Sequence, residues 1–165
     1  MKAILKRAAM AAAVVVTVGL VGAPAAFAHG DHDEHGGGGG RTILSAEVAG
    51  SLTTDPVLFQ TVAPGGADWV IRDGDARLRH DGRLDVQVKG LVLTSTGANP
   101  VTQLAASVAC NGAVVATTGV VAFSPKGDAT IHAKVTLPHR CIAPVVLLNP
   151  RGTATVYIGV TGTEG

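Results

Sequence analysis

Aromatic side chains are scarce in this chain, and their scarcity narrows the range of ligands that the sequence predicts. The 165 residues include one Trp, one Tyr and three Phe. Sites that stack bases or sugars use several aromatic side chains gathered together. The sequence holds no such group, so it does not indicate a stacking site, although glycan binding by other side chains stays open.

A basic stripe is also missing. Three of the 13 basic residues lie within the first seven positions, while all 12 acidic residues come later. The rest of the chain is therefore weakly acidic and has no run of positive charge. Because nucleic-acid binding depends on clustered positive charge, we expect no nucleic-acid partner.

The sequence has no recognisable catalytic motif. It lacks a Gly-x-Ser-x-Gly elbow, a His-Glu-x-x-His zinc motif and a phosphate-binding loop. His80, His132 and His139 are expected on a turn, on the wet face of a strand and in a loop. A catalytic triad can assemble from residues far apart in sequence, so catalysis stays an alternative. The sequence itself predicts a protein that is not an enzyme and has no cofactor.

The first 28 residues have the pattern of a cleaved signal peptide. An apolar stretch over residues 8–21 follows three basic residues and leads to a small-x-small cleavage site, Ala26-Phe27-Ala28. A membrane anchor is the alternative, but the apolar stretch is short for a spanning helix and Pro24 follows it. No later stretch is long and apolar enough to span a bilayer. We therefore predict an exported protein, secreted or held non-covalently at the cell surface.

Residues 29–40 are predicted to form a disordered tail rich in His and Gly. Their sequence, HGDHDEHGGGGG, has almost no apolar side chain to bury. His29, His32 and His35 are the candidate metal ligands, because imidazole beside carboxylate suits Cu²⁺, Ni²⁺ or Zn²⁺. Cleavage after Ala28 would add the free amine of His29. The alternative is a solvated tail with weak, incidental affinity, since its ligands are not preorganised.

Acidic and basic residues alternate between residues 72 and 85. We interpret this pattern as a solvated, salt-bridged sheet edge that discourages the addition of another strand. Asp68, Asp73 and Asp75 also lie in a Gly-containing segment of the kind that binds calcium. However, no acidic residue that could be a bidentate calcium ligand follows at a fixed spacing. The Asp-Gly pairs are more typical of turns than of calcium sites.

Cys110 and Cys141 are predicted to form a disulfide, because two cysteines in an exported chain most often pair with each other. In the chain-entropy model such a bridge contributes about 3–4 kcal/mol to stability. That contribution matters in a core of Val, Ala and Thr, which bury little area each. An intermolecular or reactive pair of thiols is the alternative.

Asn111-Gly112, directly after the first cysteine, predicts a β-hairpin with a two-residue loop. Both positions of that loop need a positive φ, which Asn and Gly tolerate best. The loop would pair Cys110 with Ala113 and Val108 with Val115, so that apolar residues meet on one face.

Alternating apolar and polar residues predict short strands and no helix after the signal peptide. A three-residue loop at 80–82 is needed to pair Leu78 with Leu84, and Trp69 is the expected aromatic anchor of the core. About seven to nine short strands at this spacing indicate an all-β domain over residues 41–165, an antiparallel β-sandwich of immunoglobulin-like or related type. The main expected strands are residues 42–52, 57–62, 84–88, 104–110, 113–117, 129–137, 145–148 and 153–160.

Several short motifs give the domain a family resemblance. They are Pro64-Gly-Gly, Trp69-Val-Ile, Asp81-Gly, Asn99-Pro, the run from Phe123 to Asp128, Val135-Thr-Leu-Pro and Cys141-x-Ala-Pro. Over residues 41–162 the pattern resembles small exported β-domain proteins of high-GC Gram-positive bacteria. The resemblance implies export and a β-domain, and it implies no activity.

The sequence therefore predicts a secreted, non-enzymatic domain with a structural, adhesive or interaction role. Its partner would be a protein or a component of the cell envelope. The alternative is an envelope protein that binds Cu²⁺, Ni²⁺ or Zn²⁺ through the His-rich tail.

Overall fold

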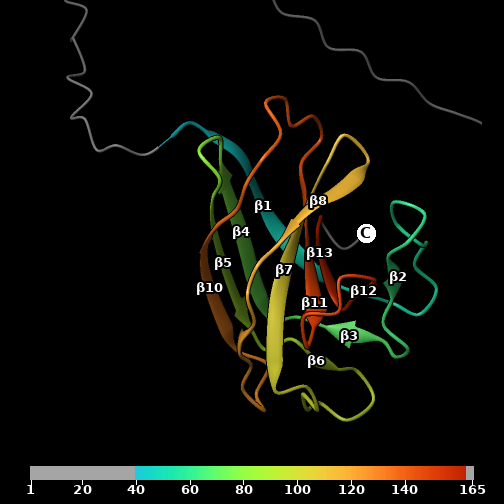
Figure 1. Cartoon of the computed structure of the whole chain (residues 1–165). Coiled ribbons are helices and arrows are strands. Elements are labelled where there is room, and N and C mark those ends of the chain that lie inside the picture. Colours follow the sequence, from blue (N-terminus) through green and yellow to red (C-terminus); the bar gives the residue numbers. More distant parts are fainter. Residues whose placement is uncertain (1–39, 163–165) are drawn as a thin grey trace, which may run out of the picture. The chain divides into compact units, whose positions relative to one another are not determined.

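The structure is a computed structural model that describes residues 40–162, and this part of the chain consists of strands and loops (Figure 1). The all-β prediction is confirmed. The predicted signal peptide and the tail up to residue 39 lie outside the described residues. The strands are β1 (Thr42–Gly50), β2 (Ala63–Pro64), β3 (Trp69–Val70), β4 (Asp73–Arg79), β5 (Arg83–Lys89), β6 (Val92–Leu93), β7 (Gln103–Cys110), β8 (Ala113–Thr117), β9 (Val121–Ala122), β10 (Ala129–Lys134), β11 (Val145–Pro150), β12 (Val156–Tyr157) and β13 (Gly159–Thr161).

Nine of these strands form one sheet in the order β10-β5-β4-β1-β13-β11-β7-β8, with β9 beside β7. Neighbouring strands in it are antiparallel. β1 belongs to both sides of the sheet, since its first part pairs with β4 and its last three residues pair with β13. We call β10, β5 and β4 the first half-sheet, and β13, β11, β7, β8 and β9 the second.

The sheet curls at β1 into a half-barrel, so that it is not a clear two-sheet sandwich (Figure 1). The antiparallel part of the prediction is confirmed, but the expected separation into two sheets is not seen. The reason is that β1 is shared, since it pairs with β4 up to Glu47 and with β13 from Val48 onward. Gly50 ends the strand where a side chain would collide with the backbone carbonyl of Trp69.

The main hydrophobic core lies between the two half-sheets. The first half-sheet contributes alternate residues of β4, β5 and β10, as a period of two predicts. The second contributes residues of β7 and β11. Burying one such side chain stabilises the fold by about 1.5–3 kcal/mol. Members of this core are Leu78, Leu84, Val86, Ile131, Leu104, Val108, Val146 and Leu148, and the predicted anchor Trp69 is buried with them.

A second, smaller group of buried side chains lies apart from this core. Val62, Leu147 and Tyr157 form it, and we call it the outer cluster. Leu147 belongs to β11, whose neighbours Val146 and Leu148 point into the main core. The outer cluster therefore covers the other face of β11. The continuous apolar run at 145–148 was predicted to be a central strand, and this prediction is confirmed.

The two predicted hairpins form. Gly82 has a φ of 84°, and Leu78 pairs with Leu84 as the three-residue loop requires. In the second hairpin Asn111 and Gly112 have φ values of 57° and 78°.

The register beyond the second turn differs from the prediction. Cys110 pairs with Ala113 as expected, but Val108 pairs with Ala116 and not with Val115. A β-bulge between Val108 and Ala109 adds one residue to β8, and this shifts every later pair.

Two predicted strands are wrong. Residues 57–62 form a tight loop, closed by a single bridge between Leu58 and Val62, with positive φ at Phe59 and Gln60. Residues 153–160 do not form one alternating strand, because β12 pairs in parallel with β2 before β13 begins. Tyr157 and Ile158 are adjacent and both buried, one in the outer cluster and one in the main core, so alternation fails there.

Candidate functional site

The candidate metal ligands of the tail, His29, His32 and His35, lie outside the described residues, and the metal site stays a prediction. Within residues 40–162 no group of three or more His, Cys, Asp or Glu side chains could hold a metal ion. Asp68 is engaged locally, since it accepts hydrogen bonds from the backbone N and Oγ1 of Thr53 at 2.7 and 2.8 Å. These bonds lower the pKa of Asp68 below its ordinary value. Asp73 forms an ion pair with Lys89. Asp68, Asp73 and Asp75 are therefore not assembled into a set of calcium ligands among the described residues.

Cys110 and Cys141 form the predicted disulfide, with their Cα atoms 4.9 Å apart. Asn111 adds a clamp at the same place. Its side chain accepts a hydrogen bond from the backbone N of Ile142 and donates one to the carbonyl of Arg140, both at 2.9 Å. Its backbone N also donates to the carbonyl of Ile142. The sequence predicted Asn111 as a turn residue and missed this second role.

The alternating charges of residues 72–85 lie on the outer face of the first half-sheet. Lys89 pairs with Asp73 at 3.4 Å, and His132 on β10 contacts Asp85 on β5 at 2.8 Å. β4 and β5 are inner strands, so the interpretation as a sheet edge is wrong. The charges face outward because the opposite side chains of the same strands fill the core. Such exposed ion pairs contribute about 0–1 kcal/mol each.

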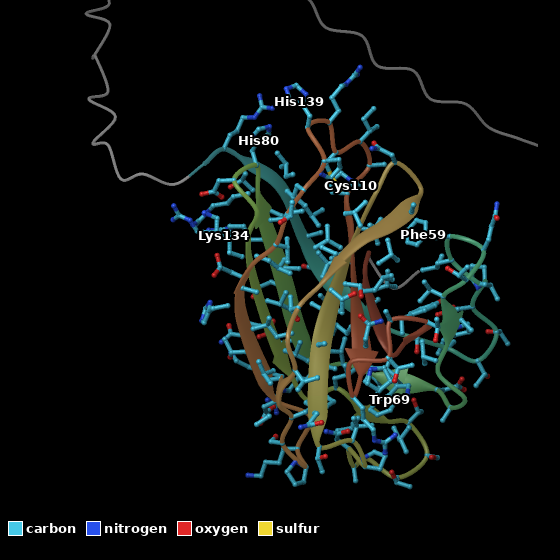
Figure 2. All side chains as sticks on the ribbon, in the orientation of Figure 1. Phe59, Trp69, His80, Cys110, Lys134 and His139 are labelled. Atoms are coloured by element: carbon cyan, nitrogen blue, oxygen red, sulfur yellow. A yellow bond between two sulfur atoms is a disulfide. The ribbon has the colours of Figure 1, made fainter. Side chains whose placement is uncertain are left out.

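An apolar cleft of about 560 Å³ lies beside the end of β1. It is bounded by the loop that follows β1, by β3 and by β13. Trp69 and Tyr157 line it from the buried side, while Leu52 on its border is 47% exposed. The first strand was expected to extend to Leu52, but β1 ends at Gly50. We call this site the apolar cleft, and it lies near the labelled Trp69 in Figure 2.

Hydrogen bonds fix the walls of the apolar cleft. The backbone carbonyl of Ser51 accepts a hydrogen bond from the backbone N–H of Trp69 at 2.8 Å, and Oδ2 of Asp55 accepts one from the N–H of Leu52 at 2.8 Å. The hydroxyl of Tyr157 donates to the carbonyl of Pro56 at 3.0 Å. Burial, followed by the charge of Asp55, raises the pKa of Tyr157 above its ordinary value. The phenol therefore stays a neutral donor at pH 7 and holds the loop in place.

The residues that line the apolar cleft are mostly apolar. Among the described residues that line it, Asp55 carries the single charge at pH 7, and none is His, Cys, Ser, Lys or Arg. Apolar walls with one carboxylate suit a partner that offers an apolar side chain together with a positive charge.

A second pocket, of about 210 Å³, lies at the other end of the domain. It is lined by Arg41, His80, His139 and Arg140, together with apolar side chains and Cys141. We call it the basic pocket. Figure 2 shows His80 and His139 at the same end of the domain, away from Trp69. The sequence placed these two histidines on a turn and in a loop but did not predict that they would share a pocket.

Comparison of the chain with protein-family models, with curated proteins and with solved structures finds no match. Within the described part of the chain there is no helix long and apolar enough to cross a membrane. Function is therefore inferred from the sites themselves.

Proposed function

We propose that the protein is an exported, non-enzymatic interaction domain that binds a protein partner through the apolar cleft. The observation that carries this proposal is the cleft itself, with exposed apolar side chains on its border. Leu52, Val57 and Val70 are three of the exposed large apolar residues of the described chain, and Leu52 and Val70 line the cleft. A gathering of exposed apolar side chains at a concave site is typical of binding surfaces.

The partner proposed here is a peptide segment that carries apolar side chains and a basic residue. The apolar side chain would enter between Leu52, Val70 and the buried ring of Trp69. Lys or Arg of the same segment would approach Asp55, the charged group of the lining. Charge complementarity at the border of an apolar site favours such a partner over an acidic one.

Export is the second part of the proposal. The disulfide supports it, because such bonds persist in oxidising surroundings outside the cytosol. The signal-peptide pattern of residues 1–28 and the resemblance to exported β-domain proteins support it too.

The face-to-face packing of the half-sheets also supports a finer proposal, namely that the domain derives from a β-sandwich whose two sheets are joined through β1.

An envelope protein that binds Cu²⁺, Ni²⁺ or Zn²⁺ is the second candidate function. The observation that favours it is the density of metal-binding groups in the tail, with His29, His32 and His35 within seven residues. Deletion of residues 29–40 separates the two candidates, since peptide binding at the cleft should be unchanged by it.

A random heptapeptide library displayed on phage and selected on the mature protein tests the leading proposal. We expect enrichment of peptides that combine apolar residues with Lys or Arg. Because Trp69 is the single Trp of the chain, its fluorescence then reports binding of the synthetic peptides at the cleft.

Leu52→Asp should abolish this binding. Val120→Asp is the matched control, because Val120 is 46% exposed, similar to Leu52, and does not line the cleft. Equal binding by both variants, or enrichment of acidic peptides, would contradict the proposal.

A further inference from the structure

The basic pocket brings together Arg and His side chains from segments that are far apart in the chain. Arg41 precedes β1, His80 lies in the turn between β4 and β5, and His139 and Arg140 belong to the loop after β10. None of the described residues that line the pocket is acidic. The ion pairs found among residues 40–162 involve neither Arg41 nor Arg140. The pocket therefore has two guanidinium groups available to an anion.

The backbone around the basic pocket is held from both sides. On one side the N–H of His80 donates to the carbonyl of Arg41 at 2.8 Å, which joins the turn to the start of β1. On the other side the disulfide fixes Cys141, and the Asn111 clamp holds the carbonyl of Arg140. The donors thus project from anchored backbone, so less ordering is required when a ligand binds.

Charges on the neighbouring elements do not cancel this positive potential. Asp81 follows His80 directly, but its carboxylate pairs with Arg83 at 3.0 Å. A hydrogen bond from the backbone N–H of Arg83 lowers the pKa of Asp81. The positive charge of the Arg83 side chain also lowers it. Lys134, on β10 of the same half-sheet, adds a further positive charge.

From this arrangement we infer that the basic pocket is a binding site for a phosphate group. A carboxylate presents two oxygens, which one Arg fork can satisfy, whereas phosphate has enough oxygens to engage two guanidinium groups and imidazole donors together. A volume of about 210 Å³ holds such a group but not a large ligand. This inference is independent of the apolar cleft and of its peptide partner.

Two sources can supply the phosphate. One is a soluble phosphate or phosphate ester. The other is the headgroup of an anionic lipid, which the apolar border of the pocket would also suit, since Ile142 is 55% exposed there. Apolar side chains beside basic ones are typical of protein surfaces that bind anionic membranes.

The first test is a titration of the ¹⁵N-labelled mature protein with inorganic phosphate, followed by NMR. Shifts are expected at residues 41–43, 80 and 137–142. The double variant Arg41→Gln/Arg140→Gln should weaken binding about tenfold or more, because it removes both guanidinium donors. Lys126→Gln/Arg151→Gln removes the same charge outside the pocket and should change affinity by less than about twofold. Equal weakening in both double variants, or shifts spread over the surface, would overturn the inference.

The second test identifies the source by co-sedimentation with vesicles. Binding to phosphatidylglycerol but not to phosphatidylcholine, lost in Arg41→Gln/Arg140→Gln and kept in the control variant, assigns the site to a lipid headgroup. Phosphate binding in the first test without vesicle binding assigns it to a soluble phosphate. Vesicle binding that the two double variants lose equally would show general charge attraction and would overturn a lipid site in this pocket.

Discussion

The outer faces of the two half-sheets differ in what they present. On the first half-sheet the outward positions of β4, β5 and β10 carry charged and polar side chains, with ion pairs such as Lys89–Asp73. On the second half-sheet Leu147 points outward from β11, and the outer cluster buries it. The outer face of the sheet is therefore exposed to water on the first half-sheet and needs a cover on the second.

This difference explains why the apolar cleft lies where it does. The outward charges of the first half-sheet require no second layer, and β4 and β5 follow one another through the short turn at residues 80–82. The apolar face of β11 must be covered, and the chain after β1 leaves the sheet to supply Val62 and to anchor on Tyr157. The cleft is formed beside this covering segment, between the loop and the end of β1.

The largest loss of stability is expected from Leu147→Ala, and this variant tests whether the two outer faces differ. Leu147 is fully buried between the sheet and its cover, so its truncation should cost about 3–5 kcal/mol in unfolding free energy. Gln87→Ala, at an outward position of β5, should change stability by less than about 0.5 kcal/mol. Urea denaturation of both variants measures the difference. Similar losses would mean that the two outer faces contribute equally.

The disulfide gives the next largest effect, because it closes a loop between two distant parts of the chain. Cys110 ends β7, and Cys141 lies in the loop between β10 and β11, the strand that pairs with β7. Replacing both cysteines by alanine should lower the unfolding free energy by about 3–4 kcal/mol. Thermal and urea denaturation measure this loss, and thiol titration of the wild-type protein should find no free thiol. Two reactive thiols would contradict the cross-link.

Tyr157→Phe should give the smallest of the three losses of stability, and it tests how the segment that covers β11 is held in place. Loss of the hydrogen bond to Pro56 should cost about 1 kcal/mol at pH 7. Burial raises the pKa of Tyr157 above 10.0, so the folded protein holds the phenolic proton longer than the unfolded chain. The contribution of the neutral phenol to the free energy of unfolding is therefore complete below pH 10.0, and it is lost as the pH rises through the pKa that Tyr157 has in the folded protein.

Tyr157 is the single Tyr of the chain, so absorbance at alkaline pH follows its ionisation directly. The wild-type protein should lose more stability than the Phe variant between about pH 10 and 12. Ionisation at or below the ordinary value would contradict the burial of the hydroxyl.

Local signals predicted the hairpins and the central strand, because each depends on residues that are close in sequence. Asn111-Gly112 specifies its own turn, and the run at 145–148 indicates burial on both faces. The course of residues 51–64 was not predictable in this way, since Val62 meets Leu147 only after the chain has left the sheet and returned.

The sites depended even more on contacts between distant segments. The apolar cleft needs Leu52 and Trp69 beside Tyr157, and the basic pocket needs Arg41 beside His139. The spacing of residues in a single sequence does not predict such contacts between distant segments. The disulfide is the exception, because the chain has two cysteines and each has the other as its possible partner within the chain.

The shared strand β1 has a consequence for the order in which the protein can fold. Val48 in β1 pairs with Thr161 in β13, so the first strand of the domain needs the last one as its neighbour. A chain that emerges with its amino end first can form the β4–β5 hairpin early, but it cannot close the sheet until β13 has followed. Such distant pairing slows folding. Under the export proposed above, translocation would thus be complete, or nearly so, before β13 can close the sheet.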